Sequence, residues 1–289
     1  MLEEFISQIR GQVSSNIEKY VGSSNLIEEA MSYSALAKSK MIRAALVCAS
    51  GKANKNINNK TLINLSTSIE LMHTYSLIHD DLPSMDNDDF RRGKESSHIK
   101  YGEANAILAG DALQALAYEI ISDDLDLQSD EKIAAIKLLS SACGKSGMVY
   151  GQFLDIESES KLINKKSIEN IYSLKTGKLI ECSVLFGQIG NSKKNEINAL
   201  KSYAEKIGLA FQITDDILEV TSNKETLGKN TNSDLKNCKS TYANVVGINN
   251  AIKKSKKLSE FAITDLQIFG SKEVDMLIEL AKYISYREK

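Results

Sequence analysis

Apolar residues recur every three or four positions along most of this chain, as they do on one face of an α-helix. Leu62, Leu65, Ile69 and Met72 form one such run, which leads directly into Asp80. The runs predict helices from Leu62 to Asp80, over Leu108 to Ile120, from Lys166 to Gly187 and from about Glu196 to Glu219.

Polar stretches separate these apolar runs and are expected to be loops. No segment shows the alternation of apolar and polar residues that is typical of strands, and no loop is long enough to mark a domain boundary. The pattern therefore predicts an all-α protein with a single domain over residues 1–289. The expected loops lie near 52–60, 122–131, 158–166, 188–195 and 222–236.

Composition supports helices and excludes several classes of protein. The 289 residues include one proline, and the net charge of −2 argues against general binding to nucleic acid or anionic membranes. The four cysteines are far apart and there are three histidines, so a zinc site is not expected. We expect the cysteines to be reduced thiols in a cytoplasmic protein. No apolar run approaches the roughly 18 residues of a membrane span, and the acidic start does not resemble a signal peptide.

Two clusters of acidic residues are the main chemical feature. One spans His79–Asp86 and continues through Asn87-Asp88-Asp89, and the other spans Gln212–Glu219. Acidic pairs usually cover solvated helix faces, but both clusters end apolar helices, where unpaired carboxylates are costly. Mg²⁺ prefers carboxylate oxygens, so two such clusters facing one cavity would hold several Mg²⁺ ions around a diphosphate.

The spacing within each cluster brings particular carboxylates together. Asp215 and Glu219 are four residues apart on one helix face, with Asp216 beside them. Asp80 and Asp86 are six apart, which on a straight helix turns them about 120° from alignment. Pro83, the only proline, lies between them and predicts an irregularity that brings Asp86 back toward Asp80.

Basic residues near both clusters are suitable partners for phosphate oxygens. Singly, each is more often a surface charge. Together they indicate two anion sites, one held through metal and the other held directly by lysine and arginine. These residues are Lys40, Arg43, Arg91, Arg92, Lys175, Lys229 and Lys239.

The motifs occur in the order in which they occur in a known family. From about Met31 to Tyr242 the chain resembles the trans-isoprenyl diphosphate synthases, and most closely their bacterial short-chain farnesyl diphosphate synthases. The stretches that carry the resemblance are His73–Gly93, Gly102–Leu113, Gly151-Gln152 with Asp155, Lys175-Thr176-Gly177, and Phe211-Gln212 with Asp215-Asp216.

The resemblance implies a helical bundle around a deep central cavity, assembled as a homodimer, that catalyses head-to-tail prenyl transfer. Dimethylallyl or geranyl diphosphate would lie between the two acid clusters and ionise. Isopentenyl diphosphate would attack the resulting cation to give farnesyl diphosphate, and the released diphosphate would accept the proton. The implied cofactor is Mg²⁺, three ions per site, with Mn²⁺ as a substitute.

The resemblance also implies a role for each matching residue. The metal ligands would be Asp80, Asp81, Asp86, Asp215 and Asp216. The allylic phosphates would be held by Arg91, Lys175, Lys229 and Lys239, and isopentenyl diphosphate by Lys40, Arg43, His73 and Arg92. Thr176 and Gln212 would direct oxygen dipoles at the cation, next to Lys175. His79 is interpreted as a packed, hydrogen-bonded residue and His98 as structural.

The chain departs from the family pattern at three places. Lys38–Ala44 keeps only one lysine and one arginine of a more basic, glycine-containing segment, Glu219 replaces an aspartate, and Cys238 stands where glycine is common. Product length would depend on Tyr75, which lies roughly 7–8 Å below Asp80 on its helix and would form the floor of the hydrocarbon pocket beside Ser76.

Three other functions remain open. A geranylgeranyl diphosphate synthase would have the same site with a deeper pocket. A terpene cyclase would need no second diphosphate site, so Lys40, Arg43 and Arg92 argue against it. A catalytically weak partner subunit is suggested by Met41 and Ala44, but the intact aspartates argue against it.

Overall fold

The computed structural model describes the backbone of residues 1–226 and 241–287, together with their side chains except those of 222–226. The described residues are almost entirely helical, and the one sheet among them is a hairpin of two short strands. The predicted all-α class is confirmed. Contacts divide the chain into two compact units, Met1–Leu139 with Phe186–Asn191, and Ser140–Leu185 with Ser192–Lys289. The single domain over 1–289 and its central cavity stay predictions.

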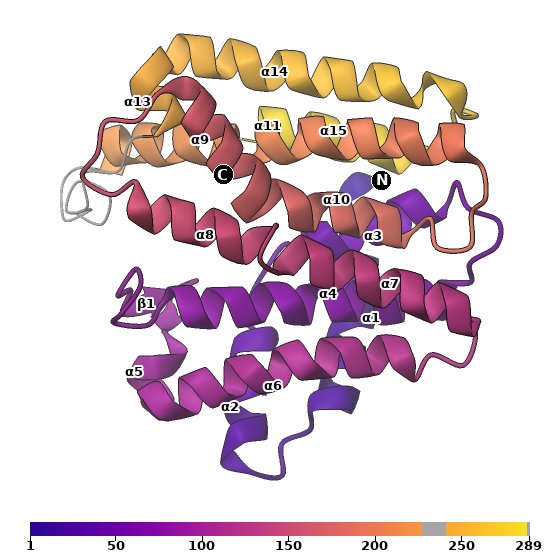
Figure 1. The fold of residues 1–289 in the computed structure, drawn as a ribbon, viewed down its shortest axis with the longest axis horizontal. Helices are drawn as coiled ribbons and strands as arrows, with labels where there is room; N and C mark the ends of the chain where they lie inside the picture. Colours follow the sequence, from indigo (N-terminus) through magenta and orange to yellow (C-terminus); the bar gives the residue numbers. More distant parts are fainter. Residues whose placement is uncertain (227–240, 288–289) are drawn as a thin grey trace. The chain divides into compact units, whose positions relative to one another are not determined.

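The first unit is built around α4 (Asn59–Asp80), which is buried on nearly all sides. Figure 1 shows α4 running beside α6 (Glu103–Ser122), its main neighbour. The hydroxyl groups of Ser66 and Ser68 donate to the carbonyl oxygens of Ala44 and Ala117, so these polar residues are buried with partners. The unit also contains α1 (Leu2–Val21), α2 (Leu26–Ala35), α3 (Ile42–Gly51), β1 (Phe90–Arg91), β2 (Lys94–Glu95), α5 (Ser97–Tyr101) and the beginning of α7 (Ser129–Cys143).

The second unit is organised by the long helix α11 (Lys194–Thr226). It runs beside α14 (Ile248–Asp265), as Figure 1 shows, and also contacts α15 (Asp275–Tyr286). Ile213 of α11 is fully buried in a cluster with Ile168, Tyr242 and Ala251. The remaining elements are α8 (Met148–Glu157), α9 (Lys165–Tyr172), η1 (Ser173–Gly177), most of α10 (Lys178–Phe186), α13 (Tyr242–Val246) and η2 (Leu266–Ile268).

Asparagines at the ends of loops begin several helices. The side chains of Asn25, Asn58 and Asn164 accept hydrogen bonds from backbone amides in the first turns of α2, α4 and α9. The predicted loops near 52–60, 122–131, 158–166 and 188–195 are confirmed, because helices end and begin at these stretches. The fifth predicted loop, 222–236, is partly wrong, since α11 continues to Thr226, and its remainder lies outside the described residues.

The predicted helix from Lys166 to Gly187 is not continuous. It divides into α9, the π-helical turn η1 and α10. Apolar periodicity cannot reveal such a turn, because one residue is added to the helix without interrupting the run. The β-hairpin was also missed, because strands of two residues are too short to show alternation. Within 1–226 and 241–287, every helix is too short or too polar to cross a membrane.

Candidate active site

The first acid cluster begins where α4 ends. Pro83 has no amide hydrogen to continue the helix, and the chain turns so that the amide of Asp86 donates to the carbonyl oxygen of Asp80 at 2.8 Å. The amide of Asn87 donates to the carbonyl oxygen of Leu82 at 3.1 Å. The predicted irregularity is confirmed, because this turn returns the backbone of Asp86 to that of Asp80.

A tight hairpin places Arg91 against the first cluster. Arg92 and Gly93, between β1 and β2, have φ angles of 55° and 78°, and a two-residue hairpin turn of this kind requires positive φ at both positions. Arg91 Nε lies 2.7 Å from Asp81 Oδ1 and 2.8 Å from Oδ2. Asp81 is 3% exposed, and its burial raises the pKa of the carboxyl while the Arg91 guanidinium opposes that shift. Arg91 therefore holds Asp81 in place.

Positive charge collects around His73, seven residues before Asp80 on α4. Burial lowers the pKa of His73 well below its ordinary value, and the charges of Arg43, Arg92 and Arg91 lower it further. The imidazole is therefore neutral at pH 7. The buried Glu70 accepts a hydrogen bond from the amide of Ala44 at 3.0 Å; burial raises its pKa, and Arg43 opposes that shift. This part of the first unit has the electrostatic character of an anion site.

The segment that departs from the family pattern leads into α3. Lys40 is exposed and Arg43 is half-buried in the first turn of the helix. Between them, Met41 has a left-handed backbone with φ of 46° and is 5% exposed. An apolar side chain packed inside the protein thus stands where the family pattern has a second cation, which leaves Lys40 and Arg43 as the predicted isopentenyl diphosphate contacts of this segment.

Tyr75 and Ser76 lie on α4 below the acid cluster. The Tyr75 ring packs edge-on against the His79 ring, with centroids 4.9 Å apart, and Ser76 Oγ donates to the carbonyl oxygen of His73 at 2.8 Å. His79 Nε2 is 3.1 Å from the carbonyl oxygen of Ile107, which confirms that His79 is packed and hydrogen-bonded. The role of Tyr75 as a pocket floor stays a prediction.

The second acid cluster lies on α11. Asp216 is 4% exposed, and its Oδ2 accepts hydrogen bonds from the Tyr172 hydroxyl at 2.5 Å and the Tyr242 amide at 2.9 Å. Burial raises the pKa of Asp216 to about 6, and the neighbouring charge of Asp215 adds to the shift. The hydrogen bonds from Tyr172 and Tyr242 oppose it without cancelling it. Asp216 therefore lies in a buried setting that disfavours its charged form.

The π-helical turn η1 places Lys175 and Thr176 beside α8 and α11. A methyl group at Gly151 of α8 would lie 2.2 Å from the backbone nitrogen of Lys175, so only glycine allows this approach. Lys175 Nζ donates to Asp155 Oδ2 at 2.7 Å, and Thr176 Oγ1 donates to Gln212 Oε1 at 2.8 Å. Single-turn π-helices are frequent at functional sites, and this one brings together the residues predicted to face the allylic cation.

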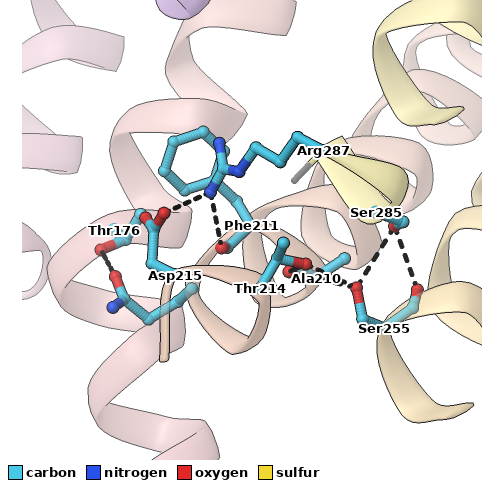
Figure 2. A network of polar contacts seen from close by, with 9 residues as sticks. Thr176, Ala210, Phe211, Thr214, Asp215, Ser255, Ser285 and Arg287 are labelled. Carbon is cyan, nitrogen blue, oxygen red and sulfur yellow. Dashed lines mark hydrogen bonds and ion pairs between the residues drawn. The ribbon is translucent and has the colours of Figure 1, made fainter. Parts of the chain in front are cut away.

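Arg287, the residue after α15, contacts Asp215. Figure 2 shows its guanidinium reaching both the Asp215 carboxylate and the carbonyl oxygen of Phe211. The guanidinium also stacks on the Phe211 ring, 4.1 Å from the centroid. The Arg287 side chain is 5% exposed, whereas that of Asp215 is 43% exposed. The acidic pair thus carries an internal cation on its buried side.

Each unit brings its own predicted residues together. In the second unit these are Lys175, Thr176, Gln212, Asp215 and Asp216, from η1 and α11. Glu219 is exposed, farther along α11. The predicted phosphate contacts Lys229 and Lys239, and Cys238, lie outside the described residues.

The donor set fits Mg²⁺. Among the described residues, no three His, Cys, Asp or Glu side chains gather around one point as a complete metal site. Mg²⁺ does not require this, because it usually keeps several waters and takes one or two carboxylates plus substrate phosphates. The predicted ligands are all carboxylates, and burial raises the pKa of Asp216, so a cation beside it would favour its charged form. Oxygen donors in this electrostatic setting suit a hard divalent cation.

Several residues at these clusters were not assigned a role from sequence. Glu70 is the one acidic residue between Leu62 and Leu77, a signal that was available. Asp155 belongs to a matching motif, but its pairing with Lys175 was not foreseen. Tyr172 and Arg287 offered no local signal, because their partners Asp216 and Asp215 are 44 and 72 residues away.

Comparison with known proteins gives one consistent result. The family model described as polyprenyl synthetase matches residues 24–277. The chain is 42% identical to farnesyl diphosphate synthase of Escherichia coli (strain K12), over 100% of this chain and 98% of that protein. It is 39% identical to a chloroplastic geranylgeranyl pyrophosphate synthase of Capsicum annuum, over 91% of this chain and 72% of that protein. A crystal structure of an FPP/GFPP synthase from Zymomonas mobilis matches with a TM-score of 0.88 and 34% identity, over 98% of both chains.

Proposed function

The chain belongs to the polyprenyl synthetase family, and we propose that it condenses isopentenyl diphosphate with dimethylallyl or geranyl diphosphate to give farnesyl diphosphate and diphosphate. It is a prenyltransferase. The supporting observation is that α4 of the first unit carries two different kinds of site for a diphosphate, one that would act through bound metal and one that would act directly. One is the carboxylate cluster at the end of the helix, and the other is the cationic region around His73. A reaction between two diphosphates needs both, whereas a terpene cyclase needs only the first.

The allylic diphosphate is the substrate that ionises. In this proposal Asp80, Asp81 and Asp86, together with Asp215 and Asp216, hold the ions that contact it. When bound, Mg²⁺, proposed as three ions and replaceable by Mn²⁺, would supply the positive charge that offsets the negative charge on the leaving diphosphate. Arg91 and Lys175, with Lys229 and Lys239, bind the phosphate oxygens directly.

Thr176 and Gln212 are proposed to stabilise the allylic cation. The Thr176 hydroxyl donates its hydrogen to Gln212 Oε1, so the hydrogen is directed away and the lone pairs of Oγ1 remain available to a carbocation. Lys40, Arg43, His73 and Arg92 hold isopentenyl diphosphate, and the neutral His73 acts as a hydrogen-bond partner rather than a charge. The departing diphosphate accepts the proton released after the new carbon–carbon bond forms.

Purified protein with Mg²⁺, labelled isopentenyl diphosphate and each allylic primer in turn tests the reaction, with products separated by chromatography. We expect a dominant C15 product. Asp81→Asn should lower kcat by about 100-fold or more, because the Arg91 pair and a metal ligand are lost together. Asp126→Asn, an exposed aspartate paired with Lys60 in a surface loop, is the control with the same charge change. Equal rates for the two variants, or no product from any primer, would contradict the proposal.

A C20 product is the second candidate, since the chain is also 39% identical to a geranylgeranyl pyrophosphate synthase. Tyr75 decides between them in our proposal. Tyr75→Ala removes the ring that packs against His79, so the product distribution should shift from C15 toward C20 or longer. Tyr75→Phe keeps the ring and should keep C15. If Tyr75→Ala still makes only C15, another residue limits chain length.

We also propose that the protein is a cytoplasmic homodimer. Ile107 and Leu108 are 42% and 52% exposed on one face of α6, and burial against a second copy would remove them from water. Light scattering during size-exclusion chromatography should give twice the mass of 31.9 kDa. A mass of one chain would contradict the dimer, and recovery in the membrane fraction would contradict the location.

A further inference from the structure

The end of α15 is held against α14, and through it α11, by contacts that do not involve the Arg287 side chain. Ser285 Oγ donates to the carbonyl oxygen of Ser255 at 3.2 Å, and Ser255 in turn contacts Thr214 of α11 at 2.8 Å (Figure 2). The backbone amide of Arg287 donates to the carbonyl oxygen of Tyr283 at 3.0 Å and closes the helix. Arg287 therefore emerges beside Asp215 because of how α15 packs.

The guanidinium is not satisfied by this position. Its Nε is buried and has no hydrogen-bond partner among the residues that the structure describes, and the side chain as a whole is 5% exposed. A buried, unpaired donor is unfavourable, so Asp215 and the Phe211 ring together must compensate for it. In a purely structural ion pair the guanidinium would have all its hydrogen bonds. Here it does not, and it occupies a position beside Asp215 that another cation could take.

Asp215 can be approached from the opposite direction. Its side chain is 43% exposed, so a cation from solution reaches a carboxylate that Arg287 contacts from the buried side. Arginine stays protonated at all working pH values, so the guanidinium leaves the carboxylate only by moving away. A divalent ion and the Arg287 guanidinium compete for the same oxygen of Asp215, so the binding of one weakens the contact of the other.

We propose that Arg287 is a positioning residue that occupies Asp215 in the metal-free protein and is displaced when a divalent cation binds there. The inference rests on the proposed function, in which Asp215 is a metal ligand. Arg287 neutralises and orients the carboxylate while metal is absent, and in doing so it lowers the affinity for the metal. The end of α15 is thereby coupled to the loading of the second acid cluster.

Metal binding in the absence of any diphosphate tests the proposal. Free Mn²⁺ is counted by electron paramagnetic resonance during titration of the full chain. Arg287→Gln should bind Mn²⁺ about fivefold more tightly than the original protein, the upper end for a pair with a half-exposed partner. A merely structural role would weaken binding instead. Arg287→Lys should fall between the two, since it keeps the charge but not the planar contact with Phe211.

Lys282→Gln is the matched control. It removes one positive charge from α15 at an exposed position, where Lys282 pairs with Glu279. The Mn²⁺ affinity of Lys282→Gln should be unchanged. A double variant with Asp215→Asn and Arg287→Gln should lose the tighter Mn²⁺ binding expected of Arg287→Gln alone. Equal Mn²⁺ affinity in Arg287→Gln, Lys282→Gln and the original protein would overturn the proposal, as would weaker binding in a folded Arg287→Gln.

The unaltered protein provides a second measurement if the Arg287 variants do not fold. Hydrogen exchange at the amides that close α15 should become faster when Mn²⁺ saturates the protein, because the guanidinium anchor is lost. Unchanged or slower exchange would overturn the proposal. The product assay distinguishes a failure of this inference from a failure of the proposed function. Intact prenyl transfer with unchanged metal affinity in Arg287→Gln refutes only this inference, whereas tighter metal binding without prenyl transfer refutes only the proposed function.

Discussion

Individual carboxylates of both acid clusters are held by groups from their own unit. Arg91 contacts Asp81, Arg287 contacts Asp215, and Tyr172 donates to Asp216. Side chains fixed in this way lose little conformational entropy when a ligand binds, which is what preorganisation requires. The cost is electrostatic, because two of these carboxyls are buried and burial raises their pKa.

Asp216 should therefore reduce the stability of the metal-free protein at neutral and alkaline pH. Its folded-state pKa of about 6 lies above the ordinary value of 3.8, so the folded state favours the protonated form. The resulting stabilisation is fully present below about pH 4 and is lost as the pH rises through 6. Asp216→Asn keeps the shape without the charge. It should raise the free energy of unfolding at pH 8 by about 1–3 kcal/mol while abolishing prenyl transfer.

Urea unfolding in the presence of a chelator measures this effect at pH 5 and pH 8. The gain from Asp216→Asn should be larger at pH 8. Asp126→Asn should show no such gain, because Lys60 lowers the pKa of Asp126 instead of burial raising it. A gain at pH 5 that equals or exceeds the gain at pH 8 would mean that Asp216 is not the titrating group.

Among the elements, the π-helical turn η1 matters most for the second unit. It interrupts what sequence periodicity predicts as one helix and carries Lys175 and Thr176. The close approach of α8 depends on Gly151, and the approach of α11 depends on Gly208, where a methyl group would lie 2.9 Å from Gly177 Cα. The arrangement of the side chains that we propose to be catalytic is thus a consequence of helix packing at glycines.

Gly151→Ala should disturb this packing. A methyl group 2.2 Å from the backbone nitrogen of Lys175 cannot be accommodated by a side-chain rotation, so α8 and η1 must separate. We expect a loss of about 2–4 kcal/mol in the free energy of unfolding. The kcat should fall at least about tenfold, because Lys175 and Thr176 move with the turn.

Gly11→Ala is the control for this substitution. Gly11 lies in α1 with nothing within 4 Å of the added methyl group, so alanine should stabilise the helix by about 0.5–1 kcal/mol. Urea unfolding and the product assay compare the two variants. If Gly151→Ala keeps both stability and kcat, the close approach of α8 to η1 is not needed for the site.

At the scale of the whole molecule, the family match spans residues 24–277 and therefore includes residues of both units. Relatives with names for different products share similar identity with the chain, 42% for a farnesyl and 39% for a geranylgeranyl synthase. Overall similarity consequently fixes the reaction better than it fixes the length of the product. We propose that the length of the product depends on single positions such as Tyr75.

The sequence by itself determined the helical class, the positions of α4, α6 and most of α11, and the acidic and basic residues of the motifs. These features are local, since helical periodicity and motif spacing are set by residues a few positions apart. The irregularity at Pro83 was predictable for the same reason. The Asp86 amide bonds the carbonyl oxygen of Asp80, six residues earlier, across the only proline.

Only the tertiary structure decided which groups hold the carboxylates. Arg287 is 72 residues from Asp215, Tyr172 is 44 residues from Asp216, and neither pair has a local signature. The π-helical turn likewise lies against α8 at Gly151 and against α11 at Gly208, two contacts that no local pattern of its own residues reveals. Such features arise when helices pack, because packing fixes which distant groups share a low-dielectric environment and so which charges must be compensated.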